Sequence, residues 1–389
     1  MDDMGTGAAA GQEIPSPATL IGRAKALVPA LRERADECET QRCMPDETFE
    51  DFRKAGILNV VKAKDFGGYE MGWDVFCEIS MELAKGCGSS AWVYAVLGEH
   101  AHTVCTYPMQ AQHDVWNDDP DAQVASGNSP NCKMERTDGG WLITGQFNYS
   151  SGCDHADWHL TGMPVDGQPL KILVPQAGCE IVDNWHVMGL AGTGSKDIKL
   201  EKVFIPDHRT IPIGERGPRF DDAALFRLPQ WSVNPFCLAS VVVGVAEGAV
   251  ERFTEEMKER SSRFGAKIAE FQSLQLRIAE SAAELHAARL MILNDLRETM
   301  EHFEDNEEPD FLMLARNKRD MAYAPILASK AMERIFYAAG ANGLFLDNDI
   351  QRAFRDVNAG SKQIALNFDV NGTTYGKMAL GLDPAPVRW

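Results

Sequence analysis

The stretch Gly145–Trp158 reads GQFNYSSGCDHADW and carries an aromatic ring, two hydroxyls and a glycine in direct succession. It follows the run GGWLIT at 139–144, whose alternation is typical of a half-buried strand leaving a tight turn. Small hydroxyl side chains beside a glycine allow a flat ligand with polar edges to approach the backbone closely. A serine- and glycine-rich loop between strands has the same composition, so a ligand site and an ordinary loop both stay open at this point.

The composition is that of a folded protein without affinity for polyanions. The 389 residues can form two or three sub-domains around sizeable cores. Hydrophobic residues make up 44% and charged residues 24%, as in soluble globular proteins. The formal net charge of -19 argues against nucleic acid and against anionic membranes as partners.

The N-terminus, the hydropathy and the cysteines together predict a cytoplasmic protein. Residues 1–16 are acidic and rich in glycine and alanine, so we expect a disordered lead-in rather than a signal peptide. No apolar run reaches the ~18 residues that a membrane span needs, and the closest, at 238–250, is interrupted by glycine and glutamate. Nine cysteines occur without a C-x-x-C pair, which favours reduced thiols and predicts no metal site.

The spacing of apolar residues then divides the chain into regions. Residues 17–120 show helical spacing, and PDET at 45–48 is a helix-start signal. Residues 121–232 contain short alternating runs punctuated by Gly, Asp and Pro, which predict a β domain. These runs are 141–144, 158–161, 170–174 and 198–205.

Residues 233–389 return to helical spacing in long segments. An acidic stretch at 301–309 is expected to link two of them. The predicted fold class is α+β, mainly α, with an N-terminal helical domain, a central barrel-like β domain and a C-terminal four-helix bundle. The expected helices are 235–262, 268–300, 309–339 and 350–365.

Four groups of short segments occur in a definite order along the chain. They are AGI with KDFGG at 55–57 and 64–68, WHVMGL with KVFIP at 185–190 and 202–206, RFG with FQ at 263–265 and 271–272, and GANG with IQR and RD at 340–343, 350–352 and 355–356. In this order they resemble the acyl-CoA dehydrogenase family along nearly the whole chain. The resemblance implies that family's fold.

The resemblance also implies a flavin site at the opening stretch. Tyr149 takes the place of a tryptophan beside the isoalloxazine ring, and Ser151 that of a threonine whose hydroxyl bonds flavin N5. Arg263 is expected to reach the flavin phosphate or adenine, within its own subunit or across a subunit boundary. The cofactor-binding residues implied in this way are Tyr149, Ser150, Ser151, Gly152, Arg263, Phe264, Gln272, Gly340 and Gly343.

The chain departs from the family where a dehydrogenase keeps its base. Acyl-CoA dehydrogenases abstract a substrate proton with a glutamate, commonly soon after the Arg-Asp pair. Here Arg355 and Asp356 are followed by VNAGSKQIALNFD, with no acid until Asp369. Because a weakly acidic C–H needs a base within reach, this loss removes the dehydrogenase chemistry. A dehydrogenase with a displaced base, at Glu247 or Glu251, stays open as an alternative.

Within the fold, the chain more closely resembles the reduced-flavin monooxygenases. The marks are SSGCDH at 150–155, His100 after AWV at 91–93, and NFD at 367–369 with YG at 375–376. This branch comprises oxygenase components of two-component hydroxylases for 4-hydroxyphenylacetate, seco-steroid phenols and indoles. The resemblance implies FADH2 or FMNH2 from a separate NAD(P)H-dependent flavin reductase, O2, a flavin C4a-hydroperoxide and a homotetramer.

The catalytic residues implied by this branch are His100, Ser126 and Ser151. Ser151 would bond flavin N5 and so slow the loss of H2O2. Ser126 and His100 would contact the substrate, and His100 would orient or deprotonate a phenol or N–H. A packing histidine on an apolar helix is the competing interpretation of His100.

The expected substrate is a small aromatic compound, phenol-type or indole-type. Gln363 stands where the 4-hydroxyphenylacetate enzymes have a histidine, and glutamine can donate a hydrogen bond but cannot take a proton at neutral pH. The expected pocket residues are Trp92, His100, Ser126, Gln363 and Phe368. A flavin-binding protein without catalytic activity is a further alternative, and it predicts no oxygen chemistry.

Overall fold

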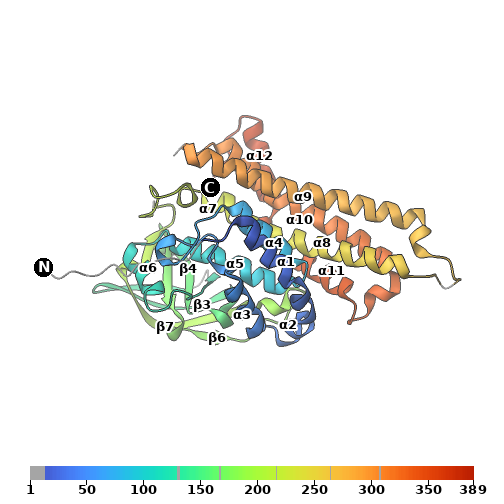
Figure 1. Cartoon of the computed structure of the whole chain (residues 1–389). Coiled ribbons are helices and arrows are strands. Elements are labelled where there is room, and N and C mark those ends of the chain that lie inside the picture. The colour runs from blue at the N-terminus through green and yellow to red at the C-terminus, as the bar shows by residue number, and fades with distance from the viewer. Residues whose placement is uncertain (1–13, 129–131, 166–167, 216, 263, 306–307) are drawn as a thin grey trace.

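The protein is described by a computed structural model for residues 14–128, 132–165, 168–215, 217–262, 264–305 and 308–389. Most of the expected lead-in and Arg263 therefore lie outside the described residues. The N-terminal helices lie between the strands and the long C-terminal helices, which extend away from the sheet (Figure 1). The architecture is the predicted one, α+β and mainly α. The domain boundaries at 120 and 232 stay a prediction.

Six helices form the N-terminal part. α1 begins after Ser16, whose hydroxyl oxygen accepts a hydrogen bond from the Thr19 N–H at 3.2 Å and so caps the helix. α5 is buried along almost its whole length, which explains why its sequence is apolar on all sides. The bounds are α1 Pro17–Glu33, α2 Ala35–Gln41, α3 Asp46–Ala55, α4 Trp73–Ala84, α5 Gly88–Val104 and α6 Met109–Trp116.

Eight strands form the central sheet in the order β6-β7-β3-β1-β4-β5-β8, with β2 beside β3. β1 pairs with β4 in parallel, and the other pairs are antiparallel. One face encloses a small core of its own, while Leu160 and Leu173 belong to the helical core. The bounds are β1 Val124–Asn128, β2 Lys133–Thr137, β3 Gly140–Ser150, β4 Trp158–Val165, β5 Gln168–Pro175, β6 Glu180–Val182, β7 Lys196–Pro206 and β8 Thr210–Pro212.

In the C-terminal part, α9, α10 and α11 pack against α8, and α12 packs against α10. The apolar segment Gln230–Glu259, which contains α8, is long enough to cross a membrane, but 94% of its most apolar window is buried among other helices. Its composition is therefore explained by its place in the core. The bounds are α7 Gln230–Val233, α8 Phe236–Glu259, α9 Gln272–Asp305, α10 Phe311–Ala339, α11 Asp349–Gly360 and α12 Phe368–Ala379.

Two local expectations are wrong. The opening stretch does not leave the strand at Thr144, because β3 continues to Ser150 and pairs with β7 through two irregularities in register. The acidic segment 301–309 is not a linker throughout, because α9 continues to Asp305. Acidic residues on the exposed side of a helix do not end it while its apolar side, here Phe303, stays buried.

Candidate active site

A β-bulge in β3 turns Tyr149 toward solvent. The register with β7 shifts by one residue between Phe147 and Ser150, and Tyr149 adopts a left-handed φ of 63°. This conformation is uncommon for a residue with a side chain and is retained where the surroundings require it. The Tyr149 ring is 68% exposed and meets the Trp185 ring edge-on at 6.2 Å between centroids.

Three hydroxyls line up behind the bulge. Ser151 Oγ lies 2.6 Å from Ser195 Oγ, which lies 2.7 Å from Thr193 Oγ1. Thr193 Oγ1 donates to the Leu190 carbonyl at 2.8 Å. Ser195 and Thr193 are buried, whereas Ser151 is partly exposed. We call Ser151, Ser195 and Thr193 the hydroxyl row.

The loop at the inner end of the row is fixed from several sides. The Leu190 carbonyl also accepts a hydrogen bond from Trp185 Nε1 at 3.2 Å, and the Leu190 N–H donates to the Asp356 carboxylate at 2.6 Å. A side chain at Gly189 would collide with the Arg355 carbonyl, at 2.3 Å from a Cβ. Burial raises the pKa of Asp356 to about 6. Leu190 is therefore held in place by contacts from its own loop and from helix α11.

The exposed groups around the bulge are compatible with a flat aromatic ligand. Tyr149 offers an aromatic face, and Val187 and Met188, on the loop that Trp185 joins to the bulge, are also exposed apolar side chains. A flat ring that is apolar over most of its area and polar at one edge fits this set of groups. Ser151 is the hydroxyl available to that polar edge.

The other two residues of the flavin segment support the turn. The Ser150 hydroxyl is buried and lies 3.3 Å from His159 Nδ1, on the inner side of the sheet. Burial lowers the pKa of His159 to about 4, so this histidine is neutral near pH 7. Gly152 has a φ of 72°, and a side chain there would press on Val93 of α5. Ser150 therefore directs its side chain away from the Tyr149 face.

His100 on α5 forms a pair with the residue before it. His100 Nδ1 lies 2.9 Å from the Val124 carbonyl oxygen, and His100 Nε2 lies 3.0 Å from Glu99 Oε2. Glu99 Oε1 accepts hydrogen bonds from Thr103 at 2.9 Å and from Asn234 at 2.6 Å. Both ring nitrogens of His100 are thus engaged within the protein.

Further polar groups face this pair from the sheet. Ser126 pairs with Leu160, and Leu160 with Leu173, so all three side chains lie on the face that packs against the helices. Lys171, two residues before Leu173, lies on the same face and donates to Gln230 of α7. Burial lowers the pKa of Lys171 to about 8, although the Glu99 charge offsets part of this effect.

We call this set the α5–sheet cluster. It consists of Glu99, His100, Ser126, Lys171, Gln230 and Asn234. Of these six, His100 and Ser126 were predicted from the sequence, and the other four were not. A signal was available for Glu99, because an acid beside a histidine stands out in the buried run AVLGEHAHTV. The sequence carried no such signal for Lys171, since a lysine in an alternating strand is usually exposed to solvent.

The other residues expected in the substrate pocket, Trp92, Gln363 and Phe368, contact parts of the chain outside the α5–sheet cluster. Trp92 is buried in the helical core, where it would contact a side chain added at Gly360, and it stands about 12 Å along α5 from His100. Gln363 accepts a hydrogen bond from the Ala365 N–H at 2.5 Å and so caps a short turn. Phe368 contacts the Tyr323 ring of α10 at 5.5 Å between centroids. None of these contacts involves the α5–sheet cluster.

The structure does not gather all the expected flavin residues within one chain. Phe264 is 95% exposed, and Gln272 begins α9. The connection between α8 and α9 that carries both lies at the right-hand end of Figure 1, whereas β3 lies among the strands at the left. Gly340 and Gly343 form a turn after α10. Arg263 lies outside the described residues.

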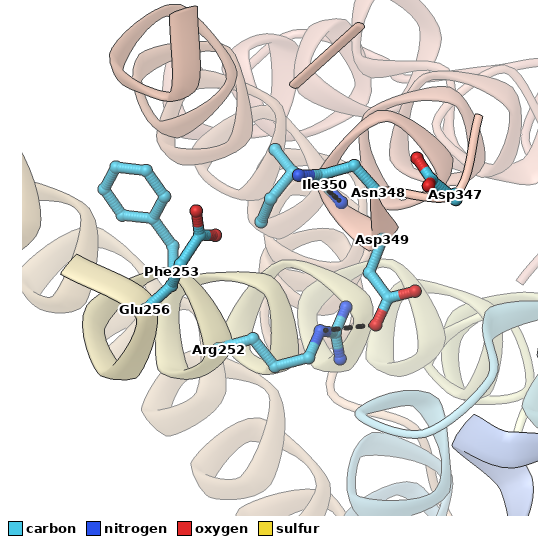
Figure 2. Close-up of a pocket in the computed structure, with 7 residues that line it drawn as sticks. All are labelled: Arg252, Phe253, Glu256, Asp347, Asn348, Asp349 and Ile350. Carbon is cyan, nitrogen blue, oxygen red and sulfur yellow. Dashed lines mark hydrogen bonds and ion pairs between the residues drawn. The ribbon is translucent and has the colours of Figure 1, made fainter. Parts of the chain in front are cut away.

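Two clefts lie beside helix α11, in the C-terminal part of the chain. One, of about 650 Å³, is lined by Val187 and Met188 together with Arg352 and Arg355, and both arginines pair with Glu39. The other, of about 290 Å³, is crossed by the ion pair of Arg252 and Asp349 at 3.4 Å (Figure 2). Among the described lining residues, neither cleft includes Ser151 or His100, so the side-chain geometry above defines the site.

The two candidates for a displaced base are committed to ion pairs. Glu247 accepts two hydrogen bonds from Arg289, at 2.9 and 2.8 Å, and Arg289 also pairs with Glu82 at 2.8 Å. Glu251 accepts a hydrogen bond from Lys85 at 2.8 Å and is largely exposed. Both carboxylates are thus held by cationic side chains of the chain itself, Arg289 and Lys85, and neither is presented to a substrate.

Known proteins share both the sequence and the fold of the chain. The acyl-CoA dehydrogenase N-terminal domain family matches residues 24–116, and the C-terminal domain family matches residues 236–368. The FADH(2)-dependent resorcinol hydroxylase, oxygenase component, of Rhizobium sp. (strain MTP-10005) is 33% identical over 94% of this chain and 95% of its own length.

Solved structures of related enzymes share the fold of the chain. The 3-HSA hydroxylase from Rhodococcus sp. RHA1 superposes with a TM-score of 0.90 at 30% identity, covering 94% of this chain and 97% of that one. XiaF from Streptomyces sp., solved in complex with FADH2 and glycerol, has a TM-score of 0.86 at 25% identity, covering 96% of this chain and 98% of that one. The chain belongs to the flavin-dependent aromatic monooxygenases of the acyl-CoA dehydrogenase fold, as one of their reduced-flavin oxygenase components.

Proposed function

We propose that this oxygenase component hydroxylates a small aromatic compound whose phenolic O–H, or indole N–H, is recognised by the α5–sheet cluster. The observation that carries the proposal is the engagement of His100 at both ring nitrogens. A backbone carbonyl can only accept, so Nδ1 carries a hydrogen. A carboxylate oxygen of Glu99 lies 3.0 Å from Nε2, close enough for a proton to pass between the two groups. The pair can therefore take up and share one proton.

Glu99 has capacity for one more hydrogen bond. A carboxylate offers about four acceptor positions; Oε1 accepts hydrogen bonds from Thr103 and Asn234, and Oε2 faces His100. A substrate O–H or N–H can occupy a free position on Oε2, and the proton can pass into the pair as the ring becomes electron-rich. A substrate carboxylate at the same place would face the Glu99 charge. The hydroxylated end of the substrate is therefore expected to be neutral before it reacts.

Ser126 and Lys171 limit the orientation of the ring. Both side chains stand on the helix-facing side of the sheet, so they bound the space beside His100. Ser126 can donate or accept a hydrogen bond, and Lys171 can only donate while it is protonated. The substrate group next to Lys171 is therefore expected to be an acceptor, such as a second ring oxygen.

We propose the following roles for the flavin segment. Reduced flavin, when bound, supplies the electrons that activate O2. Tyr149 would cover one face of the ring and keep water from it, and Ser151 would hold a hydrogen bond at N5. The chain's own part is thus to position the ring and to control one proton. FADH2 and FMNH2 both meet these requirements.

A separate reductase component must deliver the reduced flavin, as the names of the oxygenase relatives imply. We propose an NAD(P)H-dependent enzyme, a cytoplasmic location and a homotetramer. The assembly would cover apolar side chains that are exposed in the single chain, among them Phe264, Tyr337 and Leu346. Light scattering at micromolar concentration tests it, and a monomer would contradict it.

The test of the function is a substrate screen. Neutral phenols, dihydroxybenzenes and indoles are incubated with the protein, NADH and an unrelated flavin reductase, and oxygenated products are measured by mass spectrometry. We expect product from at least one neutral phenol or indole and little from matched benzoates. Hydroxylation of benzoates alone would contradict the role given to Glu99. Reduction of bound flavin by an acyl-CoA would contradict the monooxygenase activity itself.

A further inference from the structure

We propose that Thr193 and Ser195 fix the direction of the Ser151 hydroxyl, so that Ser151 accepts a hydrogen bond at flavin N5 and the site prefers reduced to oxidised flavin. The proposal rests on the proposed position of Ser151 beside N5. It assigns Thr193 and Ser195 as positioning residues, which no feature of the sequence distinguished.

The direction follows from counting hydrogens along the hydroxyl row. Two oxygen atoms at 2.6 to 2.8 Å attract each other only when a hydrogen lies between them. The Leu190 carbonyl has none, so Thr193 supplies the hydrogen for their 2.8 Å contact. Thr193 then has none for Ser195, so Ser195 supplies the hydrogen for the 2.7 Å contact. By the same argument Ser151 supplies the hydrogen for its 2.6 Å contact with Ser195.

Burial prevents the row from reversing. Thr193 is 2% and Ser195 3% exposed, so water cannot replace either partner. The Leu190 carbonyl is fixed by Trp185 Nε1, by the Thr193 N–H at 3.2 Å and through its own N–H to Asp356. A reversed row would leave the Thr193 and Leu190 oxygens in contact without a hydrogen, which is repulsive. Ser151, at the outer end and partly exposed, keeps both of its lone pairs free to accept.

The consequence concerns the redox state of the flavin. N5 of reduced flavin carries a hydrogen and donates, whereas N5 of oxidised flavin carries only a lone pair and accepts. If the Ser151 hydrogen points to Ser195, the Ser151 oxygen can accept a hydrogen bond from N5 of reduced flavin. The same oxygen would face the lone pair of N5 in oxidised flavin, which is repulsive. The loss of one neutral hydrogen bond corresponds to about a tenfold change in affinity.

Thr193→Val removes the inner hydroxyl at nearly constant volume. Ser195 then loses its acceptor and can turn its hydrogen toward Ser151, which frees the Ser151 hydrogen to point at N5. We expect oxidised flavin to bind about tenfold more tightly relative to reduced flavin than in the wild type. The midpoint potential of the bound flavin should fall by about 30 mV, because tenfold is 29.6 mV for a two-electron couple.

The experiment measures dissociation constants for oxidised and reduced flavin, and the midpoint potential, in wild type and four variants. Thr193→Ser keeps the hydroxyl and should restore the wild-type potential. Ser195→Ala removes the hydroxyl next to Ser151 and so also frees the Ser151 hydrogen. The midpoint potential should therefore fall as it does in Thr193→Val. Ser151→Ala should weaken reduced flavin without strengthening oxidised flavin. Thr161→Val, a buried threonine whose hydroxyl has no partner among the described residues, should change neither constant.

The outcomes separate this inference from the proposed function. Equal potentials in Thr193→Val, Ser195→Ala and the wild type would overturn the inference, even if flavin binds and the aromatic substrate is hydroxylated. Failure of the wild type to bind flavin in either redox state would instead contradict the proposed function. If Thr193→Val does not fold, Ser195→Ala and Thr193→Ser still decide the matter, since they must differ from each other by the same 30 mV.

Discussion

His100 Nε2 lies 3.0 Å from a carboxylate oxygen of Glu99, its neighbour in sequence. Consecutive residues of a helix point about 100° apart, so this contact is unusual. It is made possible by the Val124 carbonyl, which holds the other ring nitrogen and turns the imidazole toward Glu99. The imidazole and the carboxylate are therefore in direct contact, and their proposed roles can be separated by substitution.

Glu99→Gln should impair hydroxylation while leaving flavin binding intact. Glutamine keeps the shape but cannot share a proton with His100, so we expect hydroxylation to fall roughly 10- to 100-fold. The measurement is product formed per reduced flavin consumed. Glu301→Gln, an exposed residue of α9, is the matched control. Equal product yields from both variants would exclude a role for Glu99 in proton transfer.

His100→Ala should uncouple the reaction. Oxygen consumption with reduced flavin should continue, because Ser151 and Tyr149 are untouched, but H2O2 should replace most of the hydroxylated product. Both products are quantified in the same reaction, with His286→Ala on the exposed side of α9 for comparison. An equal loss of oxygen consumption and hydroxylation would instead indicate that His100 serves only to pack the helix.

Ser151→Ala should release H2O2 faster without harming the fold. The side chain is partly exposed and its removal leaves no cavity, so the unfolding midpoint should stay within a few degrees. Stopped-flow measurement of H2O2 formation after an oxygen pulse tests this. Ser151→Thr retains the hydroxyl and should keep the wild-type rate; unchanged H2O2 release in Ser151→Ala would remove Ser151 from N5.

Asp356→Asn should flatten the dependence of stability on pH. Because burial raises the folded-state pKa to about 6 from 3.8, the folded protein binds the proton more tightly. The free energy of unfolding contributed by Asp356 is therefore full below pH 4 and falls, by about 3 kcal/mol, as pH rises to about 6. Urea titrations of both proteins at pH 4 to 7 measure the difference; parallel curves would contradict it.

Glu247→Gln should affect stability and not catalysis. Its carboxylate is held by Arg289, so the loss of charge should cost about 2 kcal/mol of unfolding free energy. Hydroxylation should persist at the wild-type yield once the variant is folded. If hydroxylation were abolished in a folded Glu247→Gln protein, a displaced-base chemistry would have to be reconsidered.

The sequence predicted the architecture well because helical and strand spacing persist over long segments. It failed at 145–150, where a loop was expected and the strand β3 continues instead. The bulge at Tyr149 arises from pairing with β7, a long-range contact that local composition does not encode.

The candidate site was predictable only where a family position marks it. Ser151 and His100 stand at such positions, so the resemblance proposed them, and their roles stay a prediction. The hydroxyl row needs Thr193 and Ser195 to come from a second strand connection, and Lys171 becomes significant only when β5 places it beside α7. Residues that act by facing one another across the fold carry no local signal.

The most direct test of the central claim is one turnover under ¹⁸O2. The protein is mixed anaerobically with reduced flavin and a neutral phenol or indole and then exposed to labelled oxygen, and the product is analysed by mass spectrometry. The account predicts a hydroxylated aromatic product that carries one ¹⁸O atom, with H2O2 as a minor product. Formation of H2O2 alone with every neutral phenol and indole, or an unlabelled product, would contradict it.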